Sequence, residues 1–302
     1  MRILLAVDGS VSSDRATTLV ASLAFPPDSV VRIVAAQQPY SDALAMSWAA
    51  MGDAGTNLES EEEVDARHLK EAVARAESTV AQPGLKVEGF LLHGRPGTAI
   101  VDEAVAFGAD VVVLGSRGHG TIATMLLGST AAEIVDHAPC PVLVARHTHL
   151  GPVAFADDGS PSARTAEGVF TRWPIFVGQQ IDVITVAEVA VPVAAGFTPG
   201  LYDQVLDSYS RSADETRAEV AKEASGEAHR LAEAGFTTGA VALEGDAAAE
   251  IVRYAGEHEV GTIVMGTRGH TGLARLILGS VARNVLVHAT CSVLIVREDK
   301  HK

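Results

Sequence analysis

Residues 110–118 read DVVVLGSRG, in which the apolar run Val-Val-Val-Leu after Asp110 leads directly into Gly-Ser-Arg-Gly. Nine residues further on, Gly128-Ser129-Thr130 opens a segment with helical spacing. Strands that are apolar at consecutive positions are typical of parallel sheets covered by helices on both faces. A glycine at the end of such a strand lets the chain turn sharply and lets a ligand approach the backbone. The stretch therefore predicts a strand, a loop and a helix of an α/β fold.

The same layout recurs about 150 residues later, which indicates a tandem repeat. Residues 262–269 read TIVMGTRG, and Gly279-Ser280-Val281 follows after the same gap of nine residues. The N-terminal run RILLAVDGS (2–10) is echoed by PVAFADDGS (152–160), so both halves begin with an apolar run closed by Asp-Gly-Ser. Because the spacing is preserved throughout, we expect the two halves to share one fold.

Each half alternates short apolar runs with longer amphipathic segments, as βα units do. In the first half the apolar runs cover residues 2–7, 30–36, 86–92, 110–114 and 141–145. Helical spacing covers residues 61–81 and 213–234, and Ser60 with Glu63 predicts a capping box. We predict an α/β fold of two tandem five-stranded, parallel, doubly wound domains, residues 1–147 and 151–302. Such sheets bind ligands beyond the carboxyl ends of their strands.

The loops at these strand ends have the features of an anion site. Free N–H groups and the positive end of the helix dipole lie at a helix start, and a serine hydroxyl adds a donor. Glycines after strands and serines before helices also occur as plain turns and caps, and that alternative stays open. Four cations in the loops either neutralise phosphate or face solvent: Arg117, His119, Arg268 and His270. Asp8 and Asp158 contact a ligand, cap the helices that begin near Val11 and Pro161, or do both.

Composition excludes several other classes of protein. The chain has 302 residues, of which 47% are hydrophobic, and a formal net charge of -15 without a concentrated basic stretch, so we expect no nucleic-acid partner. No apolar run reaches the length of about 18 residues that suggests a membrane helix, and no secretory signal is recognised, so we expect a cytoplasmic protein without a membrane partner. Cys140 and Cys291 lack neighbours at metal-ligand spacing. Neither a P-loop nor a dinucleotide fingerprint after the first strand is present.

The pattern G-x2-G-x9-G-S after a buried strand, with an N-terminal strand ending in Asp-Gly-Ser, resembles the ATP-binding type of universal stress protein over nearly the whole chain. The resemblance implies Rossmann-like domains of the adenine nucleotide alpha hydrolase-like kind. It further implies that adenine lies near the ends of the first two strands, with ribose and phosphates on the glycine loop. A nucleotide-dependent binding or signalling module of the stress response follows as the expected function.

Carried over by motif, the resemblance implies two ATP sites per chain, with Mg²⁺ as an open question and its ligands unknown. The first site is expected to contain Asp8, Ala35 or Ala36, Gly115, Gly118, Gly128, Ser129 and Thr130, with Arg117 and His119 in its loop. The second is expected to contain Asp158, Val186, Gly266, Gly269, Gly279, Ser280 and Val281, with Arg268 and His270 in its loop. No catalytic set is identified in the sequence.

Two other functions stay open at this stage. The chain could be a slow ATPase or an autophosphorylating enzyme at the same sites, although no dedicated general base is visible. It could also be a partner-binding protein with vestigial sites. The resemblance implies that the last strands help to pair domains, and residues 141–144 and 292–295 offer matching apolar edges for pseudo-twofold pairing within the chain. A further homodimer is an additional expectation.

Overall fold

The computed structural model describes residues 1–38, 58–118, 127–188, 199–267 and 278–297. By their internal contacts they form two compact units. Unit 1 comprises Met1–Leu150 together with the last strand of the chain, and unit 2 begins at Gly151. None of the helices in the described ranges combines the length and the apolar character needed to cross a membrane.

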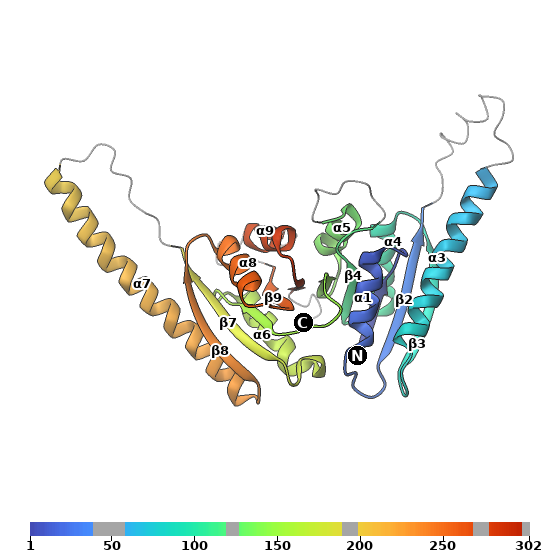
Figure 1. The fold of residues 1–302 in the computed structure, drawn as a ribbon, viewed down its shortest axis with the longest axis horizontal. Helices are drawn as coiled ribbons and strands as arrows, with labels where there is room; N and C mark the ends of the chain where they lie inside the picture. Colours follow the sequence, from blue (N-terminus) through green and yellow to red (C-terminus); the bar gives the residue numbers. More distant parts are fainter. Residues whose placement is uncertain (39–57, 119–126, 189–198, 268–277, 298–302) are drawn as a thin grey trace, which may run out of the picture. The chain divides into compact units, whose positions relative to one another are not determined.

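Unit 1 is a parallel sheet with helices on both faces (Figure 1). It contains β1 (Arg2–Ala6), α1 (Val11–Ala21), β2 (Val30–Gln37), α3 (Leu58–Val80), β3 (Lys86–His93), α4 (Pro96–Phe107), β4 (Val111–Gly115), α5 (Ser129–His137), β5 (Val142–Ala145) and β10 (Ser292–Val296). The strand order is β3-β2-β1-β4-β5-β10, and the first five strands run parallel. The chain adds β2 and β3 on one side of β1 and then β4 and β5 on the other side. This change of side makes the sheet doubly wound, as predicted.

The sixth strand of this sheet comes from the far end of the chain. β10 pairs antiparallel with β5, and Leu294 lies opposite Leu143. The hydroxyl of Ser292 accepts hydrogen bonds from the backbone N–H groups of Arg146 at 3.1 Å and His147 at 3.2 Å. The expected pairing of the two apolar last strands is thus confirmed.

Continuous burial explains why β1 and β4 lie at the centre of the unit 1 sheet. Ile3, Leu5 and Val112 have no exposed surface, because helices cover the sheet on both sides. Removing apolar side chains from water on both faces contributes about 1.5–3 kcal/mol for each large aliphatic residue. The strands therefore occupy the interior of the sheet, and their carboxyl ends open side by side at one edge.

Unit 2 repeats the arrangement with four parallel strands in the order β8-β7-β6-β9. Its elements are β6 (Val153–Ala156), α6 (Pro161–Arg172), the short 3₁₀ helix η1 (Pro174–Phe176), β7 (Gln180–Ala187), α7 (Pro199–Glu233), β8 (Thr237–Glu244), α8 (Ala247–Glu257), β9 (Thr262–Gly266) and α9 (Ser280–His288). Phe170 packs edge-on against Phe155 at 5.4 Å and Phe176 at 5.0 Å between ring centroids. These three buried rings form the centre of the core.

Two predictions about helices are corrected by the structure. α3 begins at Leu58, so Ser60 lies inside its first turn and cannot be the N-cap of a capping box. α7 spans 35 residues and starts well before the predicted residue 213 (Figure 1). The additional residues include glycine, serine and tyrosine, whose helix propensities are lower than that of alanine. The helical signal in the sequence is therefore weaker there.

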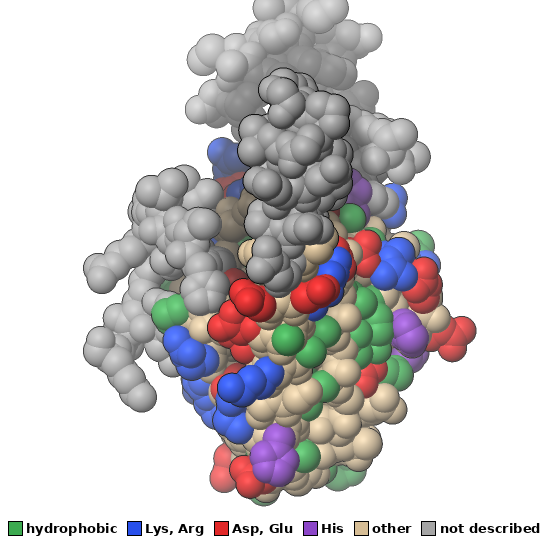
Figure 2. All heavy atoms as spheres, turned by 90° about the vertical axis from the view of Figure 1, so that its left-hand side faces the viewer, with side chains coloured by type: hydrophobic (Ala, Val, Ile, Leu, Met, Phe, Trp, Pro, Cys, Tyr) green, Lys and Arg blue, Asp and Glu red, His purple; other side chains and the backbone are tan. Residues whose placement is uncertain are grey.

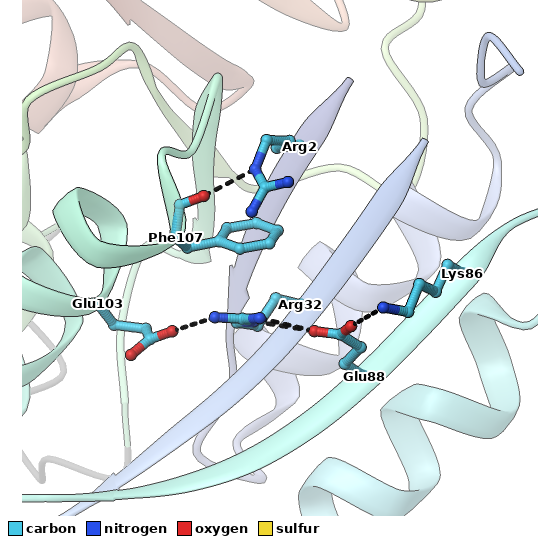
Figure 3. Close-up of polar contacts among 6 residues, drawn as sticks. All are labelled: Arg2, Arg32, Lys86, Glu88, Glu103 and Phe107. Carbon is cyan, nitrogen blue, oxygen red and sulfur yellow. Dashed lines mark hydrogen bonds and ion pairs between the residues drawn. The ribbon is translucent and has the colours of Figure 1, made fainter. Parts of the chain in front are cut away.

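A charged and aromatic cluster joins β2, β3 and α4 in unit 1 (Figure 3). Arg32 on β2 donates to Glu88 on β3 and to Glu103 on α4, both at 2.7 Å. Its guanidinium lies over the ring of Phe107, 4.2 Å from the centroid, and the guanidinium of Arg2 also lies 4.2 Å from that centroid. The planar guanidinium of Arg32 therefore both pairs with carboxylates and stacks on a ring, which a lysine could not reproduce.

Candidate functional site

The carboxyl ends of β1 and β4 lie next to each other in unit 1. Ala6 at the end of β1 pairs with Leu114 near the end of β4. The Asp-Gly-Ser loop that leads into α1 and the glycine loop that leads towards α5 start from these two ends. A cavity of about 550 Å³ lies there. The position matches the ligand-binding edge expected for a doubly wound sheet.

The Asp-Gly-Ser loop orders the start of α1 in two steps. Ser10 is the N-cap, and its hydroxyl accepts the N–H of Ser13 at 3.2 Å. Asp8 accepts the N–H of Ser10 at 3.0 Å through Oδ1. In unit 2, Asp158 accepts the N–H of Ser160 at 3.1 Å, and Ser160 caps α6. The caps are therefore the serines, and the prediction that the aspartates might cap these helices is corrected.

Gly115 and Gly266 are required by their close packing against the starts of α1 and α6. A Cβ atom on Gly115 would lie 2.5 Å from the carbonyl carbon of Ser12, the second residue of α1. A Cβ on Gly266 would lie 2.7 Å from the carbonyl carbon of Ser162 in α6. Both distances are shorter than real Cβ contacts. The first glycine of each loop is thus explained by packing within the protein.

Serines on α1 and α6 hold the glycine loops, and the sequence analysis did not identify them. The Ser12 hydroxyl accepts the N–H of Arg117 at 3.2 Å. The Ser162 hydroxyl accepts the N–H of Thr267 at 2.8 Å. Both serines lie two residues after the Asp-Gly-Ser motif, and this repeated spacing is the signal that could have found them. Their role is to fix the backbone of the loop.

Gly118 has a different neighbour from Gly115. A Cβ atom on Gly118 would collide with the Oδ2 carboxylate oxygen of Asp8. The glycine therefore lets the two loops approach each other closely at the cavity, which both residues line. This juxtaposition was not derivable from local sequence, because 110 positions separate the two residues.

The helices that follow the glycine loops begin without a side-chain cap. Gly128 is the N-cap of α5, and Gly279 is the N-cap of α9; neither can offer a capping hydroxyl or carboxylate. The N–H of Gly128 donates to the carbonyl oxygen of Ser116 at 2.8 Å, which closes the loop. By contrast, Ser10 and Asp246 cap α1 and α8. The starts of α5 and α9 are therefore suited to an external anion.

The structure brings most of the predicted first-site residues together around the unit 1 cavity. Those that line it are Asp8, Ala36, Gly115, Arg117, Gly118, Gly128, Ser129 and Thr130. Ala35 is fully buried and is not part of the lining, so of the two alternatives on β2 only Ala36 faces the cavity. His119 lies outside the described residues. Lining residues that the sequence analysis did not name are Ala6, Val7, Ser13, Pro96, Ile100, Leu114, Leu127, Ala131 and Ile134.

Unit 2 has a corresponding cavity of about 650 Å³. The predicted residues that line it are Asp158, Val186, Gly266, Gly279, Ser280 and Val281. Arg268, Gly269 and His270 lie outside the described residues. The additional lining residues are Ala156, Asp157, Ala163, Ile184, Thr185, Glu188, Thr216, Glu219, Val220, Glu223, Ala247, Ile251, Met265, Thr267 and Ala282. Ile100 of α4 and Ile251 of α8 occupy matching places, and their apolar spacing on the two helices is the signal that could have found them.

The two cavities differ in charge. In unit 1 the charged lining residues within the described ranges are Asp8 and Arg117. In unit 2 five carboxylates line the cavity: Asp157, Asp158, Glu188, Glu219 and Glu223. Burial raises the pKa of the Asp157 carboxyl, although the N–H of Gly159, which donates to it at 2.9 Å, opposes this shift. Among the described residues, no three His, Cys, Asp or Glu side chains gather as metal ligands.

Comparison with known proteins gives consistent matches for both halves. The sequence model of the universal stress protein family matches residues 1–146 and 151–297. A universal stress protein of Mycolicibacterium smegmatis is 28% identical over 314 aligned residues, which cover 98% of this chain and 96% of the relative. A universal stress protein of Thermus aquaticus is 33% identical over 144 residues, which cover 48% of this chain and 97% of the relative.

A solved structure extends the likeness to the fold of the whole chain. The universal stress protein from Archaeoglobus fulgidus has a TM-score of 0.64 with this chain at 18% identity, and the match covers 98% of both chains. At this identity the likeness concerns the fold alone. It agrees with the tandem doubly wound architecture described above.

Proposed function

Since this chain belongs to the universal stress protein family, whose sequence model matches both of its halves, we propose that it is a nucleotide-dependent binding module of the stress response. Each cavity takes one adenine nucleotide, with ATP as the expected ligand. Tandem membership of the family supports the stress-response role. The observation that carries nucleotide binding is the start of α5 and of α9, where a glycine replaces the usual capping residue beside a glycine loop.

The residues around each cavity fit a nucleotide in size and in chemistry. Volumes of about 550 and 650 Å³ fall within the usual range of about 300–1,000 Å³ for small-molecule sites. The backbone N–H groups at Ser129 and Thr130, with the Ser129 hydroxyl, would hold phosphate oxygens in unit 1. Ser280 and Val281 would do so in unit 2. Apolar lining residues such as Ile100 and Ile251 supply surface for a base.

Asp8 and Asp158 line the same cavities as these helix starts, on the loops that follow β1 and β6. Each accepts one backbone N–H, from Ser10 and Ser160 respectively. A carboxylate at this place suits a ribose hydroxyl, which donates hydrogen bonds. If Mg²⁺ accompanies the nucleotide, phosphate and water oxygens would supply most of its ligands, as is usual for this ion.

The direct test is to denature the purified protein and to identify and quantify the released nucleotide by mass. Protein stripped of ligand is then titrated with Mg-ATP by calorimetry, with ADP, AMP and cyclic AMP as competitors. We expect about two equivalents of adenine nucleotide per chain, one for each cavity. The ratio of ATP to ADP over time reports turnover. No released nucleotide, together with no binding in the titration, would refute the proposed function.

A further inference from the structure

The carboxylate of Glu133 links two helices that both contribute to the unit 1 cavity. Glu133 lies on α5, and its Oε1 atom accepts a hydrogen bond from the Thr98 hydroxyl of α4 at 3.0 Å. Its Oε2 atom lies 3.3 Å from the guanidinium of Arg95, the residue before α4. Of the two helices, α4 supplies Pro96 and α5 supplies Ser129 to the cavity lining. The three linked residues are not part of the lining, so they can act on the site only through the helices that carry them.

The sequence of α4 makes room for this carboxylate. A Cβ atom on Gly97, the second residue of α4, would lie 2.5 Å from Oε2 of Glu133, which is closer than real Cβ atoms approach. The N-cap of α4 is Arg95, which makes no side-chain capping hydrogen bond. A carboxylate near a helix start stabilises the helix through its dipole. Glu133 therefore supplies the carboxylate at the start of α4, but from the neighbouring helix.

Burial separates this carboxylate from ordinary surface charges. Figure 2 shows charged side chains at the surface of unit 2 around α7. On that helix Arg217 pairs with Asp214, and the two side chains are 46% and 74% exposed. Exposed pairs of this kind contribute about 0–1 kcal/mol, and the pair of Glu133 with the exposed Arg95 resembles them. The Glu133 side chain itself is only 23% exposed, so its contacts with Thr98 and with the start of α4 are the stronger part of the link.

Unit 2 has different residues at the four matching positions. Counted from the helix starts, the pairs are Arg95 and Asp246, Gly97 and Ala248, Thr98 and Ala249, and Glu133 and Asn284. Asp246 caps α8 with its own carboxylate, which accepts the N–H of Ala249 at 2.9 Å. Ala248 carries the Cβ for which unit 1 has no room, and Asn284 carries no charge. The carboxylate at the helix start thus comes from the N-cap in unit 2 and from the neighbouring helix in unit 1.

In unit 1 the link restrains the helix that begins at the proposed phosphate site. Ser129 and Glu133 are four positions apart on α5 and therefore lie one turn apart on the same side of the helix. A contact that holds Glu133 against α4 thus holds the first turn of α5, whose free N–H groups would bind phosphate. The capping contact of Asp246 stays within the start of α8 and places no such restraint on α9. A site that is ordered before its ligand arrives loses less free energy to ordering on binding.

We propose that Glu133 is a positioning residue for nucleotide binding in unit 1. By joining the start of α4 to the first turns of α5, it holds the phosphate-binding helix start in place before the ligand arrives. Unit 2 caps its corresponding helix separately, so the two duplicated sites differ in how far they are ordered in advance. The proposal rests on the nucleotide-binding function proposed above.

The test removes the link without leaving α4 uncapped. The triple variant Arg95→Ser, Gly97→Ala and Glu133→Asn gives α4 a serine N-cap, fills the space of the carboxylate and leaves the net charge unchanged. We expect it to melt within a few degrees of wild type, whereas Glu133→Asn alone should melt lower because the start of α4 loses its carboxylate. In two-site calorimetric titrations with ATP, both variants should bind about two- to tenfold more weakly at one site, the worth of one ordinary hydrogen bond. The other site should be unchanged.

Two single variants serve as controls. Glu133→Gln keeps an acceptor for the Thr98 hydroxyl and should keep the ATP affinity within about twofold of wild type. Asn284→Ala changes the matching position of α9 and should alter the affinity of neither site. Hydrogen exchange of the ligand-free proteins reports the link without any nucleotide. The amides of α5 should exchange faster in the triple variant than in wild type, and those of α9 should exchange at the same rate.

Three outcomes separate the possible failures. A triple variant that melts like wild type and also binds ATP like wild type would overturn this proposal alone, because Glu133 would then act only on stability. Equal exchange of the α5 amides in wild type and the triple variant would overturn it as well, whether or not ATP binds. A wild type that binds no ATP would instead overturn the nucleotide-binding function.

Discussion

A negative charge at the start of α5 should separate the stability of this helix from its capacity to bind phosphate. Ser129 is the first residue of α5, is exposed, and follows the uncapped Gly128. In Ser129→Asp the new carboxylate lies at the positive end of the helix dipole, which stabilises a helix by about 0.3–1 kcal/mol. We therefore expect the ligand-free variant to melt at the same temperature as wild type or up to a few degrees higher.

The same carboxylate should repel a bound phosphate. One pair of unit charges 4 Å apart repels by about 1 kcal/mol in bulk water and about 4 kcal/mol at the effective dielectric constant of a protein surface. Because Ser129 is exposed, we take the lower end and count two phosphate charges, which gives about 2 kcal/mol or about 30-fold weaker binding. The loss should shrink as salt is added, since exposed charges are screened.

Calorimetric titration with ATP measures this effect, and Ser129→Ala is the matched control without the charge. Ser129→Asp should weaken one of the two sites by about 30-fold, and the double variant with Ser280→Asp should weaken both. Ser129→Ala should lose only the contribution of the hydroxyl, about two- to tenfold. Unchanged affinity and stoichiometry in Ser129→Asp would refute the reasoning that phosphates bind at the start of α5.

Three further changes test other parts of the structure. Gly115→Ala should lower the free energy of unfolding by about 1–3 kcal/mol in urea titration, because its Cβ would overlap the backbone of Ser12; equal stability would show that α1 moves away freely. Arg32→Lys should lower the free energy of unfolding by about 1–2 kcal/mol in the same titration, because lysine cannot pair with both carboxylates while stacking on Phe107. Unchanged stability would show that the stacking and the paired carboxylates do not stabilise the fold. Burial raises the pKa of Asp157 above its unfolded value, so its protonated form favours the fold, and this stabilisation is lost as pH rises through the folded pKa. Asp157→Asn should therefore be more stable than wild type near pH 7, and the difference should close as pH falls towards about 4 in urea titrations; a gap independent of pH would contradict this account.

The sheet was predictable because its signal is continuous and local. Residues 110–114 were predicted as a strand, and β4 spans Val111–Gly115. The four residues of β4 before Gly115 are all buried and apolar, so nearly every position of the strand carries the apolar pattern. The starts of helices were harder to predict from the sequence. The serine at position 60 has the spacing of a capping box, but the helix begins upstream of it.

The candidate site was predictable where a loop and the next helix start carry it. Gly128 and Ser129 stand out through their spacing after a strand, and the structure places both at the cavity. Residues such as Thr216 and Glu219 could not be identified, because they reach the unit 2 cavity only through the packing of α7 on the sheet. Gly115 was correctly placed in the loop, but its contact with Ser12 depends on tertiary structure.

The pairing of β10 with β5 also has a consequence for how the chain is made. Ser292, which accepts hydrogen bonds from the backbone at Arg146 and His147, is synthesised 146 residues after Arg146. At a translation rate of about 5–20 residues per second, β5 waits about 7–30 s for its neighbour on the ribosome. During that time its apolar edge is an open template for other strands. We therefore expect chains that are released before residue 292 to need chaperones, although the other strands of the first sheet are complete.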